Sequence, residues 1–135
     1  MTTEENIVRI PAGKAIIEGA LRMPPQPDGI VLFAHGSGSS RHSPRNNYVA
    51  RILNDNNLAT LLMDLLTPEE DANYETRFDI GLLTQRLITA TNWMQNNTLT
   101  PSLPIGYFGA STGSAAALKA AAALGVDGQT WQEMT

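Results

Sequence analysis

The pattern of hydrophobic and polar positions changes after the first thirty residues. From Ile7 to Pro11 and from Ala15 to Leu21, apolar and polar side chains are interleaved, and a turn at Pro11-Ala12-Gly13 separates the two runs. This alternation predicts two antiparallel strands joined as a hairpin. The proline-rich cluster from Pro24 to Gly29 then stops the second strand.

Continuous apolar runs replace the alternation further along the chain. They cover Ile30–Ala34, Leu58–Met63 (closing on Asp64) and Ile105–Phe108. Short runs without polar positions are typical of strands that are buried on both faces of a parallel sheet. We therefore expect three such strands.

Helical spacing appears between and after these runs. Asn46 is placed to cap a first helix and Asp79 a second, longer one, while the alanine-rich segment from Ser111 to Leu124 predicts a third with Gly125 at its end. A hairpin followed by βαβαβα predicts a three-layer α/β/α sandwich, with a mostly parallel sheet and an antiparallel hairpin at its N-terminal side. We expect one domain over residues 1–135.

Composition narrows the functional classes. The formal net charge is −4 and only nine residues are basic, with Lys14 and Lys119 far apart, so no basic stripe favours nucleic acid. Cysteine is absent, which excludes disulfides, thiolate metal sites and a cysteine nucleophile. The polar N-terminus and the lack of a long apolar run predict neither a secretory signal nor a membrane span. We expect a cytoplasmic protein without metal or cofactor.

The strongest chemical signal is the G-x-S-x-G pentapeptide from Gly109 to Gly113. It lies between a predicted buried strand and a predicted helix, where a nucleophile elbow occurs. Such a turn presents the Ser111 hydroxyl at the carboxyl end of the sheet. The backbone N–H of Thr112, at the start of the helix, then points toward an oxyanion formed on the attacked carbonyl. The competing interpretation is a glycine-rich turn with a serine helix cap.

A second signal is the Gly/Ser-rich segment after the first buried strand. An acyl-transfer site needs a second backbone N–H near that of Thr112, and we assign it to Ser37, with Gly36 permitting close approach. A dinucleotide-binding loop is the alternative, but the third glycine of that fingerprint is replaced by Arg41, and Pro44 is expected to delay the helix.

Together these segments resemble the α/β-hydrolase superfamily, in particular its dienelactone-hydrolase-like branch. The resemblance rests on His35–Arg41, Ser43–Asn46, Asp64–Thr67 and Gly109–Gly113, and it covers nearly the whole chain. It implies cofactor-free hydrolysis of an ester, lactone or similar acyl bond in a small molecule. Dienelactone hydrolases themselves use a cysteine nucleophile, where this chain has Ser111.

The rest of a catalytic triad is missing from the sequence. In this superfamily an acid and then a histidine follow the serine, yet after Ser111 the acids are Asp127 and Glu133 and there is no histidine. His42 precedes the elbow and is a weak candidate for the pocket mouth. Arg41 is a candidate for attracting an anionic substrate, whereas Asp64 is expected to accept loop amides.

These gaps set the functional hypotheses. The first is a serine hydrolase that is weak or inactive as this chain, which we interpret as truncated or frameshifted after the elbow. The second is a non-catalytic remnant or small-molecule binding module, and the third is a nucleotide-binding domain. Because the segment from Val126 to Thr135 lacks an apolar run, we expect the strand Ile105–Phe108 to be an exposed sheet edge through which the chain self-associates.

Overall fold

The computed structural model describes residues 3–34, 41–76, 79–96, 103–110, 112–124 and 130–133. Its strands are β1 (Glu4–Ala12), β2 (Ala15–Met23), β3 (Gly29–Ala34), β4 (Leu58–Asp64), β5 (Ile105–Ala110) and β6 (Thr130–Glu133). Its helices are α1 (Pro44–Asp55), the short α2 (Pro68–Asp71), α3 (Ile80–Gln95) and α4 (Thr112–Leu124). Every strand and helix that the sequence predicts is present.

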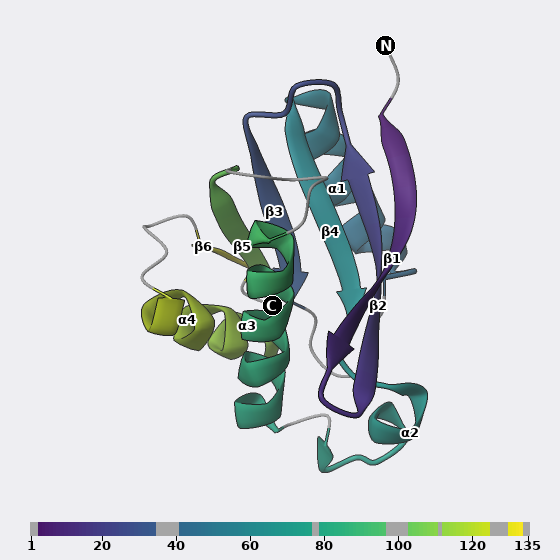
Figure 1. Ribbon diagram of the computed structural model, residues 1–135, viewed down its shortest axis with the longest axis vertical. Coiled ribbons are helices and arrows are strands. Elements are labelled where there is room, and N and C mark those ends of the chain that lie inside the picture. Colours follow the sequence, from purple (N-terminus) through teal and green to yellow (C-terminus); the bar gives the residue numbers. More distant parts are fainter. Residues whose placement is uncertain are drawn as a thin grey trace.

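The described strands form one sheet in the order β1-β2-β4-β3-β5-β6. The hairpin β1–β2 is antiparallel, and β2 joins β4 in antiparallel register, whereas β4, β3, β5 and β6 run parallel to one another. The predicted mostly parallel sheet with an antiparallel hairpin at one side is confirmed (Figure 1).

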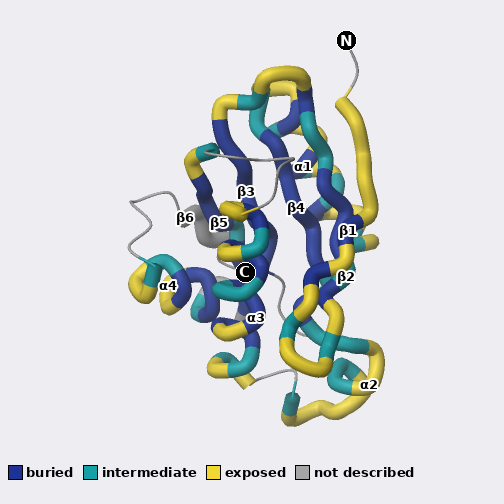
Figure 2. The backbone as a smooth tube through the Cα atoms, in the orientation of Figure 1, coloured by how far each residue is buried: buried dark blue, intermediate teal, exposed yellow. Residues whose placement is uncertain are grey.

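Helices cover both faces of this sheet, as the three-layer prediction requires. In Figure 1, α3 and α4 lie in front of the sheet and α1 lies behind it. The front layer packs apolar side chains of α3 and α4 onto Leu32, Leu61 and Tyr107. Behind the sheet, Ala50 of α1 packs with Phe33, Val31 and Leu62. The central strands β3 and β4 are accordingly buried, and the outer strand β1 is the most exposed (Figure 2).

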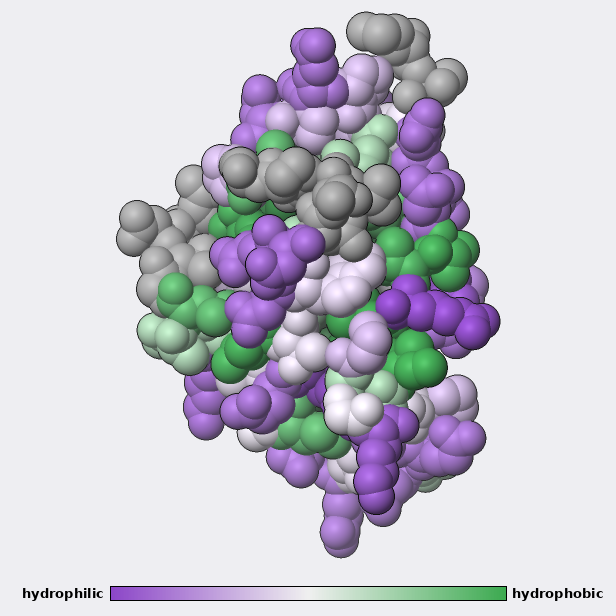
Figure 3. All heavy atoms as spheres, viewed as in Figure 1, coloured by the Kyte–Doolittle hydropathy of each residue, from purple (hydrophilic) through white to green (hydrophobic). Residues whose placement is uncertain are grey.

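The outer surface of the front helices carries both hydrophilic and apolar side chains. Figure 3 shows hydrophilic and neutral side chains over α3, with apolar surface at α4 and beside the hairpin. No helix in the described ranges is both long enough and apolar enough to cross a membrane.

Two local predictions are wrong. Helix α1 starts earlier than expected, because the Ser43 side chain caps it by accepting from the Asn46 amide at 3.3 Å and Pro44 occupies its first turn. Proline suits that position, since its fixed φ matches the helix and its missing N–H has no helical partner. Pro44 therefore begins the helix instead of delaying it.

The second error concerns the C-terminal segment. Residues Thr130–Glu133 form β6, which pairs in parallel with β5 from Tyr107 to Ala110. Strand β5 thus has neighbours on both sides, and the expectation that Ile105–Phe108 forms an exposed edge is wrong. The four residues of β6 contain no apolar run that would mark them as a strand.

A buried hydroxyl pair fixes β5 against α3. The Tyr107 and Thr91 side chains are both 0% exposed, and their oxygens lie 2.6 Å apart. Thr91 also bonds to the Leu87 carbonyl at 2.8 Å, where only its hydroxyl can donate, so Tyr107 donates to Thr91. Burial raises the pKa of Tyr107, and the bond to Thr91 opposes that rise in part.

The pair predicts unequal effects of single substitutions on the free energy of unfolding. Thr91→Val leaves the Tyr107 hydroxyl buried without an acceptor and should cost about 1–3 kcal/mol, whereas Tyr107→Phe should cost about 0.5–1.5 kcal/mol. The double variant should cost less than the sum, because no polar group is then stranded. Urea denaturation of the four proteins measures this, and strict additivity would contradict the assigned bond.

Candidate functional site

The strand order creates a topological switch point at one end of the sheet. From β3 the chain passes behind the sheet through α1, and from β5 it passes in front through α4, although β3 and β5 are neighbours. Their carboxyl ends are aligned, with Ala34 of β3 paired to Gly109 of β5. In open α/β sheets, ligands bind where adjacent connections diverge to opposite faces in this way.

The predicted nucleophile belongs to the junction between β5 and α4. Strand β5 ends at Ala110 and helix α4 begins at Thr112, so Ser111 is the single residue that separates them. Ser111 lies outside the described residues, and only the backbone of Thr112 is described. Gly113 is buried in the first turn of α4.

The first backbone N–H groups of α4 have no carbonyl partner inside the helix. Such groups favour negative charge at a helix N-terminus. The junction therefore offers the type of donor that an oxyanion requires, at the same sheet end as the exit from β3. Gly36 and Ser37, the predicted partners in that segment, lie outside the described residues.

The chain that follows Gly36 and Ser37 is anchored at Arg41. Its backbone N–H donates to Asp64 Oδ1 at 2.8 Å, and Asp64 is the last residue of β4. The expectation that Asp64 accepts a loop amide is confirmed. Arg41 thus ties the chain that follows Gly36 and Ser37 to the carboxyl end of the sheet.

The Arg41 side chain is directed at carboxylates of the protein itself. Its Nε lies 3.4 Å from Asp64 Oδ2, and one terminal nitrogen lies 3.9 Å from Glu18 Oε2. Asp64 and Glu18 are direct cross-strand partners, so the guanidinium reduces the repulsion between them. The side chain is 18% exposed. These contacts support a positioning role for Arg41, and attraction of substrate stays a prediction.

Asn47 also anchors this turn, although it is not among the site residues that the sequence predicts. Its side-chain amide donates to the carbonyls of Arg41 at 2.9 Å and Ser43 at 2.8 Å, and its oxygen accepts from Arg22 at 3.0 Å. One residue of α1 thereby joins the end of β2 to the turn that precedes the helix. Two of these partners are four and six residues away, but Arg22 lies 25 residues away, so the link to β2 cannot be found from a local pattern.

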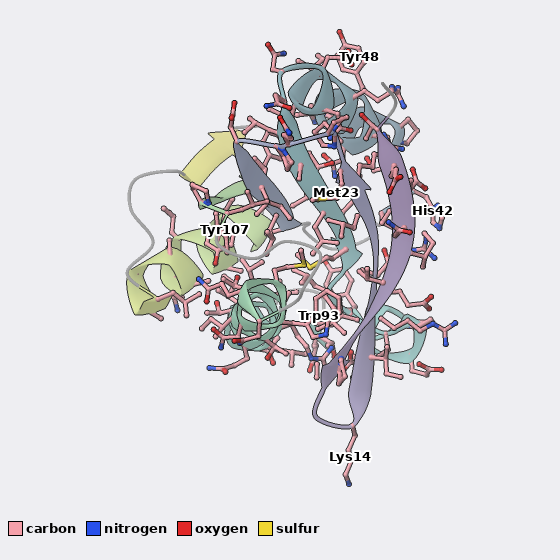
Figure 4. The ribbon with its side chains drawn as sticks, turned by 45° about the horizontal axis from the view of Figure 1, so that its top comes forward. Lys14, Met23, His42, Tyr48, Trp93 and Tyr107 are labelled. Atoms are coloured by element: carbon pink, nitrogen blue, oxygen red, sulfur yellow. The ribbon has the colours of Figure 1, made fainter. Side chains whose placement is uncertain are left out.

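His42 is exposed. Figure 4 places it on the hairpin side of the molecule with its ring directed outward, whereas β5 and α4 lie toward the opposite side. This orientation gives no support to His42 as a base for Ser111. Within the described residues, no cluster of three or more potential ligands could hold a metal ion.

An ion pair fixes the connection that leaves the site after β4. Arg86 of α3 is 9% exposed and binds both carboxylate oxygens of Glu70, at 2.8 and 2.6 Å, and also the Leu65 carbonyl at 3.0 Å. Glu70 closes a capping box with Thr67 at the start of α2. The hydrogen bonds from Arg86 lower the pKa of Glu70 to about 2, outweighing the opposing effect of burial.

Comparison with solved structures identifies the architecture. The crystal structure of a dienelactone hydrolase from Anabaena variabilis superposes with a TM-score of 0.88 and 50% identity, over 98% of this chain and 62% of that one. The chain has the α/β-hydrolase fold. A serine hydrolase without a lid from Xanthomonas campestris (TM-score 0.70, 20% identity, covering 93% and 59%) and a cold-adapted esterase from an Arctic metagenomic library (0.72, 15%, 89% and 56%) share it.

The curated relatives are named as transferases, whereas the structural neighbours are named as hydrolases and esterases. Two Mycobacterium tuberculosis proteins, from strains CDC 1551 and H37Rv, are 58% identical over 115 residues and are provisionally named phosphoribosyl transferases. The matched segment covers 85% of this chain but 26% of each relative, so the chain spans about a quarter of their length. No family model matches the chain. The structural neighbours support placement in the α/β-hydrolase superfamily.

The lowered pKa of Glu70 predicts acid sensitivity of this hydrolase fold. Because the folded-state value is about 2 against an ordinary 4.5, the stabilisation is complete above pH 4.5 and is lost as the pH falls toward 2. We expect Glu70→Gln to be destabilised at pH 7 by about 1–3 kcal/mol and to lose less stability between pH 5 and 3 than the unsubstituted chain.

Thermal or urea unfolding at stepped pH values measures this difference. Glu69→Gln is the matched control, since Glu69 is an exposed neighbour on the same short helix. The control should keep the steep loss of stability in acid. Equal pH profiles for Glu70→Gln and the unsubstituted chain would show that the ion pair does not govern acid stability.

Proposed function

We propose that this chain carries the nucleophile and oxyanion-binding part of a serine hydrolase that acts on an ester, lactone or similar acyl bond of a small molecule. Ser111 is the nucleophile, and the backbone N–H groups of Thr112 and Ser37 stabilise the oxyanion. Gly36 permits close approach of the substrate. The observation that carries the proposal is the strand–Ser111–helix junction at the switch point of the sheet, in a chain that is 50% identical to a dienelactone hydrolase.

Contacts at both ends of the segment that contains Gly36 and Ser37 support these assignments. Ala34, at the start of the segment that holds Gly36 and Ser37, is paired to β5, and Arg41 at its end is bonded to Asp64. Both ends of the segment are therefore fixed at the carboxyl edge of the sheet, one beside β5 and the other at the end of β4. An oxyanion hole depends on such preorganisation, because its donors must be in place before charge develops.

A complete hydrolase needs a base that residues 112–135 do not provide. They contain no histidine, and a serine hydroxyl without an adjacent base is a poor nucleophile at neutral pH. We infer that full activity requires an acid and a histidine from another polypeptide segment. The transferase name belongs to proteins of which this chain matches about a quarter, so it does not decide the chemistry of this part.

A non-catalytic binding module is the second candidate, and the missing histidine favours it. The same segments and their anchors would serve equally to hold a small acyl compound without cleaving it. The two candidates differ in whether the Ser111 hydroxyl reacts, which separates them experimentally.

We expect the chain alone to hydrolyse p-nitrophenyl acetate only slightly faster than buffer, because the base is absent. Free imidazole should supply that base from solution and raise the protein-dependent rate. The increase should vanish in Ser111→Ala and persist in Thr89→Ala, which removes a hydroxyl from the exposed side of α3. Absorbance at the nitrophenolate band, with protein-free imidazole subtracted, provides the measurement.

Three outcomes are distinguishable in this assay. An imidazole-dependent rate that requires Ser111 supports the nucleophile assignment. Robust turnover without imidazole that also requires Ser111 would show that the chain contains its own base, and His42→Ala would then be the next variant. No dependence on Ser111 under either condition rejects the hydrolase proposal and favours the binding module.

A further inference from the structure

Strand β1 forms the outer limit of the described sheet on the hairpin side. It pairs with β2 alone, over all nine of its residues. Figures 1 and 2 show no described element along its outer side and a largely exposed strand. An open edge of this length presents unpaired backbone groups to any chain that approaches in an extended conformation.

Hairpin geometry determines which backbone groups face outward. Ala12 and Ala15 flank the two-residue turn, where Gly13 has a φ of +62°, and residues in that position exchange hydrogen bonds across the hairpin. Because such pairs alternate along the ladder, the even-numbered residues of β1 bond to β2. The N–H and C=O groups of Glu5, Ile7 and Arg9 therefore face outward.

Pro11 marks the end of this bonding edge. It is an odd-numbered residue, so its missing N–H lies on the open side, where no hydrogen bond within the sheet is lost. The outward donors of β1 are thus centred on Ile7, with one charged residue two positions before it and one two positions after it. The Ile7 side chain is 53% exposed, so an apolar group lies at the centre of this edge.

We propose that β1 pairs with β1 of a second copy of this chain, antiparallel about a two-fold axis at Ile7. Ile7 then lies opposite its own copy, and Glu5 lies opposite Arg9 of the other chain on both sides of the axis. Opposite charges in such cross-strand positions attract, whereas like charges repel. Sliding the pairing by two residues in either direction places Ile7 against a charge and leaves one charge without its opposite.

The existing contacts leave these side chains available. Glu5 accepts from Arg22 Nε at 2.9 Å, which holds its carboxylate on the same sheet face as Ile7. The Arg9 side chain is 73% exposed and lies 4.0 Å from Glu18, a distance typical of a weak surface ion pair. Charges on an edge strand usually prevent association, but here their symmetric spacing makes the edge complementary to itself.

The proposed interface is small, because it consists of one strand pair and the side chains beside it. Interfaces below the standard size are generally weak and reversible. The dimer should therefore form in a concentration-dependent manner and dissociate on dilution.

Disulfide trapping tests the two-fold axis directly, because the chain has no cysteine. Opposed residues in an antiparallel hydrogen-bonded pair have Cα atoms about 5.5 Å apart, within the range that a disulfide spans. Under mild oxidation Ile7→Cys should form covalent dimers several-fold faster than Ile16→Cys. Ile16 is the matched control, since it is also 53% exposed but lies on β2.

Charge substitutions test the register. Arg9→Glu and Glu5→Arg should each be monomeric at concentrations where the unsubstituted chain dimerises, because each opposes like charges. An equimolar mixture of the two variants should associate again, since every cross-strand pair is then of opposite sign. Net charge cannot explain that recovery: the unsubstituted chain carries −4 and both variants remain negative.

Sedimentation velocity over a concentration series measures both single variants and their mixture, and circular dichroism confirms that each is folded. Equal trapping rates for Ile7→Cys and Ile16→Cys, or a monomer at every concentration, would overturn the proposal. So would a dimer that persists in both charge variants, because association would then use another surface or register.

Discussion

The position of β3 between β4 and β5 is the constraint on which the site depends. Parallel neighbours need crossover connections, and those connections are right-handed. Since β4 and β5 flank β3 on opposite sides, the two crossovers place α1 and α3 on opposite faces of the sheet. The connections that leave β3 and β5 therefore separate at their carboxyl ends. The switch point is a consequence of topology, whatever side chains lie beside it.

Polar contacts hold the chain segments that leave the carboxyl ends of β3 and β4. Asp64 receives the Arg41 amide, and Asn47 binds the carbonyls on either side of the turn that follows. On the other connection, Arg86 binds Glu70 with both terminal nitrogens. Each of these groups is at least partly buried and satisfied, which is the condition under which a polar contact gives a unique arrangement instead of a cost.

The sequence predicts the architecture well because its strongest signals are local. Continuous apolar runs and helical spacing define β3, β4, β5 and the main helices, and parallel strands necessarily bring their carboxyl ends together. Strand β6 escapes prediction, since Thr130–Glu133 gains its conformation from pairing with β5 and not from its own side chains. The cap of α1 is misassigned because Ser43 and Asn46 are both good capping residues, although Pro44 directly after Ser43 is a local signal that favours Ser43.

The candidate site is predicted in part for the same reason. The strand before Ser111, the helix after it and the position of Asp64 follow from local patterns, and the described backbone agrees with these. The role of Ser111 itself stays a prediction. The partners of Arg41 could not be predicted, because Glu18 and Asp64 belong to strands whose register is set by the whole sheet. The bond between Asn47 and Arg22 spans 25 residues and that between Arg86 and Glu70 spans 16, separations that no short motif records.

Anchoring at both Ala34 and Arg41 also limits how this site can diversify during evolution. The six residues between them must begin at a paired strand end and finish at the Asp64 carboxylate. Insertions or deletions there would have to be accommodated between two fixed points, whereas exchange of side chains would not disturb either anchor. This segment is thus expected to vary by point substitution at constant length.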